Sequence, residues 1–170
     1  DNVTCGTGDG ITIGSDDITL DCSIYGITGS GEHAGILVDN HDNVVIKNCN
    51  VTNFYYGIKV LNSNNVQIIE ENNLQLNDFY GIYLYNTEDV LINNNSIIDD
   101  NNGVYMIGSD NTTISNNIIN LQKKFYGVYA FNTNNSNIIN NTLWDNYHGV
   151  YLVNSPDTNV TSNNISASDV

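Results

Sequence analysis

A repeated pattern of hydrophobic and polar positions runs through most of the chain. Six segments begin with a glycine followed by an aliphatic residue, at Gly35, Gly57, Gly81, Gly103, Gly127 and Gly149. Successive glycines are separated by 22 or 24 residues, and a looser copy of the segment begins at Gly10. The pattern therefore divides the chain into about seven coils of 22–25 residues.

Within each coil the apolar residues recur at fixed distances from the glycine. The first and third residues after it are aliphatic, as in Ile82 and Leu84, and this alternation is the period of a β-strand. An apolar residue also stands eleven residues after the glycine in every coil: Ile46, Ile68, Ile92, Ile114, Ile138 and Val160. A third apolar position follows: Val51, Leu74, Ile97, Ile119, Leu143 and Ile165. Since no coil can bury its own apolar face, the pattern predicts stacked coils of three short strands, about 4.8 Å apart, around one continuous core.

Asparagine is the commonest residue of the repeat, with 33 copies in the chain. One set lies five residues after the glycine: Asn40, Asn62, Asn86, Asn132 and Asn154. Another set lies fourteen residues after it: Asn95, Asn117, Asn141 and Asn163. Asparagine tolerates turn conformations, and stacked amides can hydrogen-bond to one another. We therefore interpret the asparagines as structural residues of the turns.

The repeat has the consensus Gly-aliphatic-x-aliphatic-x-Asn-Ser/Thr and continues with a segment such as Ile138 to Leu143. This pattern resembles the NosD-like parallel β-helix repeats. These repeats belong to the pectate-lyase-like group of carbohydrate-binding and sugar-hydrolase domains. The resemblance implies an all-β, single-stranded, right-handed parallel β-helix of a kind common in surface proteins. It implies no particular activity, because fold and function separate on such scaffolds. NosD itself is linked to maturation of a periplasmic copper centre, but one Met and three scattered His predict no copper site here.

Charge and hydropathy narrow the set of partners. Four Lys, no Arg and 19 acidic residues give a net charge of −15, which disfavours nucleic acid and anionic membranes. No run of 18 apolar residues predicts a membrane span. The composition favours a secreted or cell-surface protein. Residues 1–170 are predicted to form one β-helix domain, either a segment of a longer rod or an uncapped subunit, because neither end resembles a cap.

The enzymes of this fold group would need recognisable catalytic side chains. Elimination of the lyase type uses a basic residue beside acidic Ca²⁺ ligands. The chain has no Arg. Its lysines are not grouped with acidic residues at matching coil positions; they are Lys47, Lys59, Lys123 and Lys124. Hydrolysis needs a cluster of carboxyl groups on an outward sheet face, and those positions hold Tyr, Leu, Ile, Phe and Val. The Tyr-Asp-Pro-His motif of epimerases is missing, because Pro156 is the only proline. The sequence predicts no catalytic residue.

No metal or other cofactor is predicted, with Ca²⁺ as the one weak alternative. Three acidic pairs could offer oxygen ligands to Ca²⁺, without the spacing of a known calcium loop: Asp16 with Asp17, Glu70 with Glu71, and Asp99 with Asp100. Asp39, His41 and Asp42 lie in one predicted turn, which we interpret as a polar loop in preference to a metal or acid–base site. His148 takes the position before the glycine that Tyr56, Tyr80 and Tyr126 occupy in other coils, which indicates a packing role.

Aromatic and aliphatic residues occupy the outward positions of the glycine-led strands. Two columns are expected, two and four residues after the glycine, and their central members are Tyr83, Tyr85, Tyr105, Ile107, Tyr129, Phe131, Tyr151 and Val153. Such a ribbon would exceed the apolar patch that a monomer usually exposes. Three interpretations remain open: a stacking ladder that stabilises the rod, a surface for self-association or another surface protein, and a glycan groove in which Tyr faces stack on sugar rings.

Two covalent modifications are candidates. Cys5, Cys22 and Cys49 show no CxxC spacing, and we expect either one disulfide with a free thiol or buried small side chains, with the pairing open. Asn-x-Ser/Thr sequons, which chance also produces in an Asn-rich chain, occur at Asn2, Asn50, Asn94, Asn111, Asn134, Asn140, Asn159 and Asn164.

The sequence favours a non-catalytic, exported β-helix module for scaffolding, adhesion or self-assembly, with copies of itself or other surface proteins as partners. The alternative is a polysaccharide-binding or processing domain whose catalytic residues are absent or lie outside this segment.

Overall fold

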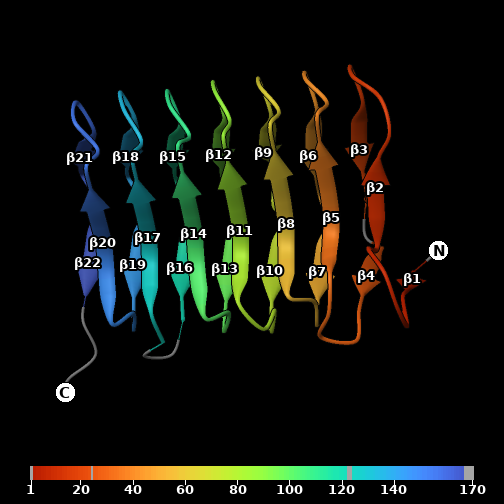
Figure 1. The fold of residues 1–170 in the computed structure, drawn as a ribbon. Helices are drawn as coiled ribbons and strands as arrows, with labels where there is room; N and C mark the ends of the chain where they lie inside the picture. Colours follow the sequence, from red (N-terminus) through yellow and green to blue (C-terminus); the bar gives the residue numbers. More distant parts are fainter. Residues whose placement is uncertain (1, 24, 122–123, 167–170) are drawn as a thin grey trace.

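The computed structural model describes residues 2–23, 25–121 and 124–166, which form 22 β-strands and no helix. The strands lie in three parallel sheets, and each coil adds one strand to each sheet (Figure 1). Sheet B consists of β2 (Ile11–Ile13), β5 (Ala34–Asp39), β8 (Tyr56–Leu61), β11 (Tyr80–Tyr85), β14 (Asn102–Ile107), β17 (Tyr126–Phe131) and β20 (His148–Val153).

The other two sheets are built from shorter strands. Sheet C consists of β3 (Thr19–Asp21), β6 (Val45–Lys47), β9 (Gln67–Ile69), β12 (Leu91–Asn93), β15 (Thr113–Ser115), β18 (Asn137–Ile139) and β21 (Asn159–Thr161). Sheet A consists of β1 (Val3–Thr4), β4 (Gly26–Thr28), β7 (Asn50–Thr52), β10 (Asn73–Gln75), β13 (Ser96–Ile98), β16 (Ile118–Asn120), β19 (Thr142–Trp144) and β22 (Asn164–Ser166).

The coils wind as a right-handed helix. Sheet B faces the viewer in Figure 1 with its strands pointing upward, and the chain returns behind it through sheets C and A while it advances from the N-terminus to the C-terminus. Equivalent residues pair from coil to coil, so that Ile82 lies between Ile58 and Val104. The predicted all-β, right-handed parallel β-helix of about seven coils is confirmed.

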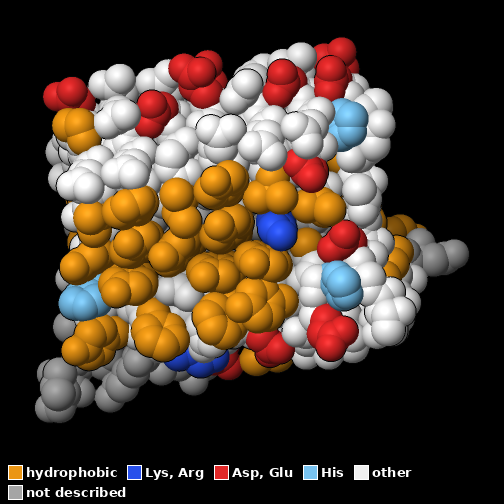
Figure 2. Space-filling model, viewed as in Figure 1, with side chains coloured by type: hydrophobic (Ala, Val, Ile, Leu, Met, Phe, Trp, Pro, Cys, Tyr) orange, Lys and Arg blue, Asp and Glu red, His pale blue; other side chains and the backbone are white. Residues whose placement is uncertain are grey.

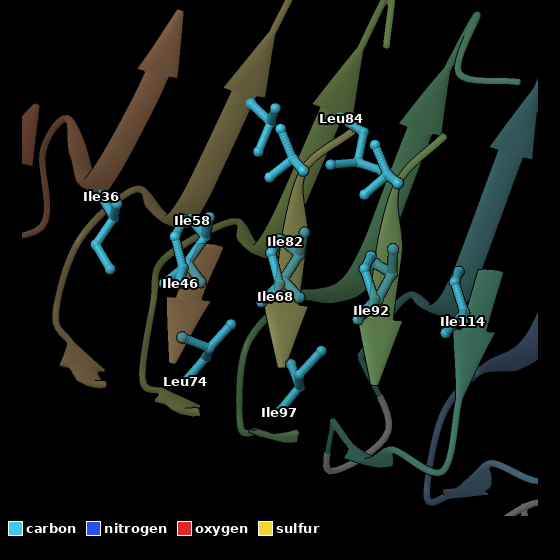
Figure 3. Close-up of a cluster of buried hydrophobic side chains, with 14 of the residues drawn as sticks. Ile36, Ile46, Ile58, Ile68, Leu74, Ile82, Leu84, Ile92, Ile97 and Ile114 are labelled. Atoms are coloured by element: carbon cyan, nitrogen blue, oxygen red, sulfur yellow. The ribbon is translucent and has the colours of Figure 1, made fainter. Parts of the chain in front are cut away.

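The core is a set of aliphatic columns inside the coils. One coil contributes Ile82 from β11, Ile92 from β12 and Ile97 from β13, and all three are fully buried (Figure 3). Burying a side chain of this size stabilises the fold by about 1.5–3 kcal/mol. The three apolar positions that recur in the sequence are therefore the three inward positions of each coil.

The glycine that marks each repeat is required by close packing between neighbouring coils. A Cβ atom on Gly103 would lie 2.4 Å from the carbonyl oxygen of Gly127 and 2.6 Å from Cγ2 of Ile119. Both distances are too short for real atoms, so any larger residue would push the coils apart. This explains why the glycine recurs at the start of the sheet B strand.

The asparagines fourteen residues after the glycine form a buried hydrogen-bonded ladder at the corner between sheets C and A. The side-chain amide of Asn95 donates to Oδ1 of Asn117 at 3.1 Å, and that of Asn117 donates to Oδ1 of Asn141 at 3.0 Å. The predicted stack is thus confirmed, and it extends to Asn163. Asn72 also belongs to it, donating to Asn95 at 2.9 Å, and escaped the pattern because it stands fifteen residues after its glycine.

Asparagines five residues after the glycine end the strands of sheet B in the left-handed conformation. Asn62, Asn86 and Asn132 have φ angles of 48°, 53° and 51°. Asparagine enters this region more readily than most residues, which confirms the turn interpretation.

A disulfide joins two of the N-terminal coils. Cys22 and Cys49 are bonded across a Cα–Cα distance of 4.8 Å, whereas Cys5 is a half-buried free thiol. Cys49 stands fourteen residues after its glycine, at the position that later coils fill with the buried asparagine, and its N–H donates to Oδ1 of Asn72 at 3.0 Å. The covalent bond thus lies at the N-terminal end of the asparagine ladder.

Candidate functional site: the aromatic face of sheet B

The outward side chains of sheet B form the largest continuous apolar surface seen in Figure 2. The parallel register places Tyr105 beside Tyr83 on one side and Tyr129 on the other, and Tyr129 beside Tyr151. Their ring centroids are 6.0, 4.3 and 5.8 Å apart, with planes within 13° of parallel. The column predicted two residues after the glycine is therefore a stacked tyrosine ladder.

A second column lies four residues after the glycine, next to the turn that leads to sheet C. Tyr85, Ile107, Phe131 and Val153 occupy successive coils in register. Tyr85 is 46% exposed, and the other three are half-buried. Both columns of the sequence prediction thus lie on one face of the sheet.

The face is wider than the sequence analysis predicted, because two more aromatic columns enter it. They consist of the two residues directly before the glycine: Tyr55 and Tyr56, Phe79 and Tyr80, Phe125 and Tyr126, and Tyr147 and His148. Tyr56 stacks on Tyr80 at 5.3 Å, and Tyr126 stacks on His148 at 5.4 Å. The recurring pair of aromatic residues before Gly57, Gly81, Gly127 and Gly149 was the signal that would have found them. The packing role expected for His148 fits its place in this column.

The orientation of the rings changes the expected chemistry of the face. Since neighbouring tyrosines stack along the rod, each ring covers part of the next one, and the outer surface consists largely of ring edges and hydroxyl groups. The glycan interpretation assumed open ring faces, and this geometry does not provide them along the Tyr83–Tyr151 ladder. A ligand here would meet hydrogen-bonding hydroxyls between apolar edges.

The hydroxyl groups of Tyr80, Tyr83 and Tyr105 are held in the protonated, donating form. Burial chiefly, and then the neighbouring Tyr129 and Tyr80, raise the pKa of Tyr105. Burial also raises the pKa values of Tyr80 and Tyr83. Lys59 is in register with Tyr83, and its Nζ lies 4.5 Å from the centre of the Tyr56 ring in a cation–π contact.

The polar candidates from the sequence lie at the margins and are already engaged with one another. His41 Nδ1 lies 3.1 Å from Oδ1 of Asp16, and hydrogen bonding to His41 is the main reason that the pKa of Asp16 is lowered. Asp42 accepts the N–H of Asn64 at 2.6 Å, and Asp39 accepts the amide of Asn40 at 2.8 Å. The polar-loop interpretation accounts for this turn.

The expectation that lysines are not grouped with acidic residues at matching coil positions is wrong for Lys47, whereas Lys124 pairs with an acidic residue at a different coil position. Lys47 is in register with Asp21 and bonds Glu70 at 3.1 Å, and Lys124 bonds Oδ1 of Asp99 at 3.0 Å. Comparing equivalent positions of the coils did not predict these ion pairs, because a long lysine side chain reaches an acidic residue of the neighbouring coil. Asp17 accepts the amide of Asn43 at 2.8 Å. Lys123 lies outside the described residues.

The described part of the chain contains no group of three His, Cys, Asp or Glu side chains that could hold a metal ion. The side chains that copper prefers as ligands therefore do not come together there. Met106 is fully buried in the core, and Cys22 and Cys49 are consumed by their disulfide. His41 pairs with Asp16, while His148 stacks on Tyr126 in a different part of the molecule. These residues do not fit a copper centre. The Ca²⁺ alternative stays a prediction.

The sequons are accessible with one exception. Asn134 is half-buried, and its amide donates to Asp110 at 3.2 Å. The exposed ones are Asn2, Asn50, Asn94, Asn111, Asn140, Asn159 and Asn164.

Fold and site together define a right-handed parallel β-helix with an aromatic face and polar turns. The family model described as periplasmic copper-binding protein (NosD) matches residues 2–170, and the chain belongs to this NosD family. Its members are exported proteins, so the predicted exported location is confirmed. None of the described segments is a helix of the length and hydropathy needed to span a bilayer.

Solved structures share the fold at low sequence identity. The A-module of a mannuronan C-5 epimerase from Azotobacter vinelandii has a TM-score of 0.68 and 16% identity, over 99% of this chain and 58% of that one. An alginate lyase from a Paenibacillus species has a TM-score of 0.61 and 15% identity, over 82% and 66%. A periplasmic alginate epimerase has a TM-score of 0.54 and 15% identity, over 84% and 51%. The chain thus spans between half and two thirds of these proteins. No curated protein matches it.

Proposed function

We propose that this chain is an exported, non-catalytic β-helix module that binds a polysaccharide along the aromatic face of sheet B. The observation that carries the proposal is the face itself. Two columns of aromatic and aliphatic side chains run over successive coils, and two aromatic columns, interrupted at Asn101 and Asn102, lie beside them. Exposed apolar surfaces of this extent in soluble proteins mark interaction sites.

The regularity of the face favours a ligand that repeats. Neighbouring coils lie about 4.8 Å apart and present equivalent outward positions. A chain of identical units can therefore make the same contact with each coil. Tyrosine provides large, rigid contact area with a hydroxyl at its edge, at little cost in side-chain entropy. The solved relatives in fold are named for alginate and mannuronan, which are polysaccharides, and this supports the ligand class.

The non-catalytic part of the proposal is supported by what the face carries. Glycoside cleavage requires two carboxyl groups at a fixed separation beside the bound sugar. The central outward positions of sheet B instead hold Tyr83, Tyr105, Tyr129 and Tyr151 in one column, and Tyr85 and Phe131 in the next. A phenol held protonated by burial is a hydrogen-bond donor at neutral pH and a poor base.

Affinity electrophoresis through gels containing soluble polysaccharides tests the binding. We expect wild-type protein to be retarded, and the double variant Tyr105→Ser/Tyr129→Ser to migrate freely. Trp144→Ser is the matched control, because Trp144 lies in sheet A and is 47% exposed. The pair Tyr105→Phe/Tyr129→Phe keeps the stacked rings and isolates the hydroxyls. Circular dichroism verifies that each variant is folded.

Two results would contradict the proposal. Release of reducing ends or of unsaturated products from any polysaccharide would show that the chain is catalytic. A protein that binds no polysaccharide but sediments as an oligomer, dissociated by Tyr105→Ser/Tyr129→Ser, would assign the face to self-association, one of the three interpretations that the sequence leaves open.

A further inference from the structure

A hollow of about 350 Å³ lies in the turns between sheets B and C, beside the aromatic face. It is adjacent to that face in the chain, because Tyr85 directly precedes Asn86 and Ile107 directly precedes Gly108. Its lining residues are Asn62, Asn64, Asn86, Thr87, Glu88, Gly108 and Asp110. We name it the Gly108 hollow.

The hollow sits where a ladder of asparagines is interrupted. Asn62 donates to Asp39 at 3.4 Å, and Asn86 donates to Oδ1 of Asn62 at 3.0 Å. The next coil has Gly108 in place of asparagine, so within the described chain no side chain donates to Oδ1 of Asn86. The ladder therefore stops at the hollow with an acceptor group left free for a ligand.

Neither packing nor backbone conformation requires glycine at this position. A Cβ atom on Gly108 would meet nothing within 4 Å, unlike the glycines of the repeat. Its φ of 55° matches the 53° of Asn86 and the 51° of Asn132, so asparagine fits the same turn. The glycine leaves open the space above the turn that an asparagine side chain would fill, which indicates a role other than stabilising the fold.

A second polar group at the hollow lacks a partner. Thr87 is 3% exposed, and its Oγ1 makes no hydrogen bond to the described residues. The equivalent hydroxyls in the flanking coils, of Ser63 and Ser109, donate to the carbonyl groups two residues earlier at 2.7 and 3.1 Å. Buried hydroxyls without a partner are uncommon in native proteins, and a bound water, ion or ligand group commonly supplies the missing partner.

We infer that the Gly108 hollow is a subsite for one uncharged sugar unit of the polysaccharide bound on the aromatic face. This inference rests on the proposed function. Sugar hydroxyls donate to the carboxylates of Glu88 and Asp110 and both donate to and accept from the amides of Asn62 and Asn86. A uronate unit would bring its carboxylate against Glu88 and Asp110 in a protein of net charge −15, and repulsion disfavours it.

The test is Gly108→Asn, measured by calorimetric titration with cellohexaose, mannohexaose and a hexamer of mannuronate. Gly14→Asn is the control for an added asparagine, because Gly14 directly follows β2 in a coil that does not line the hollow and its Cβ also meets open space. We expect Gly108→Asn to weaken binding of a neutral hexamer at least tenfold without lowering the thermal midpoint, and Gly14→Asn to change neither.

Equal affinity in wild type and Gly108→Asn would overturn the subsite and leave the proposed function standing. Absence of binding of all three hexamers to wild type, in both calorimetry and affinity electrophoresis, would overturn both. Preference for the mannuronate hexamer would overturn the uncharged ligand. A titration with CaCl₂ alone that gives binding lost in Gly108→Asn, with sugar binding unchanged, would make the hollow a cation site instead.

Discussion

The carboxyl group of Asp100 accepts the backbone N–H of Asn77 at 2.6 Å through Oδ1, while its buried Oδ2 has no hydrogen-bond partner among the described residues. Asn77 in the preceding coil and Asn146 further along the rod have an Nδ2 group where Asp100 has Oδ2. Their Nδ2 groups donate to the carbonyl oxygens of Val51 and Ile119, both at 3.4 Å. Asp100 thus takes the place of an amide in a column where an N–H donor is needed.

Replacing Asp100 by Asn should stabilise the protein at neutral pH. The variant supplies the missing donor and removes a buried carboxyl group, and each such group costs about 1–3 kcal/mol when unsatisfied. We expect the free energy of unfolding in urea at pH 7.5 to rise by about that amount. Asp99→Asn is the control, because Asp99 is partly exposed and its ion pair with Lys124 is worth at most about 1 kcal/mol. A less stable Asp100→Asn would contradict the assignment.

The stability of the wild-type protein should fall as pH rises from about 4 to about 7. Burial, opposed by the hydrogen bond from Asn77, raises the pKa of Asp100 from 3.8 to about 7. The folded state therefore binds a proton more tightly than the unfolded state, and raising pH through this window favours unfolding. Above pH 7 the penalty is complete and the curve should level off. Urea midpoints between pH 4.5 and 8.5 measure it, and Asp100→Asn should flatten the slope.

Asp16 and Asp21 contribute in the opposite direction and in a more acidic range. Hydrogen bonds from His41 and Asn48 lower their pKa values below 3.8, so their contribution is present above that pH and fades as pH falls through the lowered values. A stability that rose continuously from pH 4.5 to 7 would therefore show that Asp100 is ionised in the folded state, contrary to the prediction.

Reducing the disulfide should loosen the N-terminal coils more than the rest of the rod. Cys22 and Cys49 are 27 residues apart, and closing a loop of this size stabilises a fold by about 3–4 kcal/mol in the chain-entropy model. We expect hydrogen exchange to accelerate in β3 to β7 after reduction, and little change in β14 to β18. Cys5→Ser should behave as wild type and also prevents thiol exchange. Uniform acceleration along the whole chain would contradict this prediction.

The inward residues could be predicted from one sequence because their spacing is the spacing of the coils. Ile82, Ile92 and Ile97 recur at set distances from the glycine, and stacking equivalents on equivalents leaves one arrangement of the core. The corner asparagines follow the same rule except in the Gly57 coil, where one extra residue stands between β9 and the asparagine. Asn72 is displaced by one residue in the sequence, yet its side chain still occupies the ladder.

The outward surface could be predicted only in part, because what matters there is how side chains meet across rungs. The Tyr105 column was evident from position, but its stacked geometry was not, since ring orientation depends on both neighbours. The ion pair of Lys124 with Asp99 joins residues at different positions of their coils. The Gly108 hollow arises from one side chain missing in a ladder, and its volume depends on how the neighbouring turns pack.

The buried asparagine ladder should be among the least tolerant parts of the fold. Asn117 donates to the carbonyl of Ile92 at 3.0 Å and to Oδ1 of Asn141 at 3.0 Å, and its own Oδ1 accepts the backbone N–H and the side-chain amide of Asn95. Asn117→Ala leaves all of these groups buried without their partner. Because each unsatisfied buried group costs about 1–3 kcal/mol, we expect a loss of at least about 3 kcal/mol.

Asn137→Ala separates this effect from the general cost of losing an asparagine in a strand. Asn137 lies in β18 with a half-buried side chain that makes no hydrogen bond to the described residues, so its removal should cost less than about 1 kcal/mol. Urea unfolding of both variants measures the difference. If Asn117→Ala and Asn137→Ala were equally stable, water would have to replace the lost amide inside the corner. The ladder would then be a consequence of the coil stacking, because its hydrogen bonds would contribute nothing to holding the coils together.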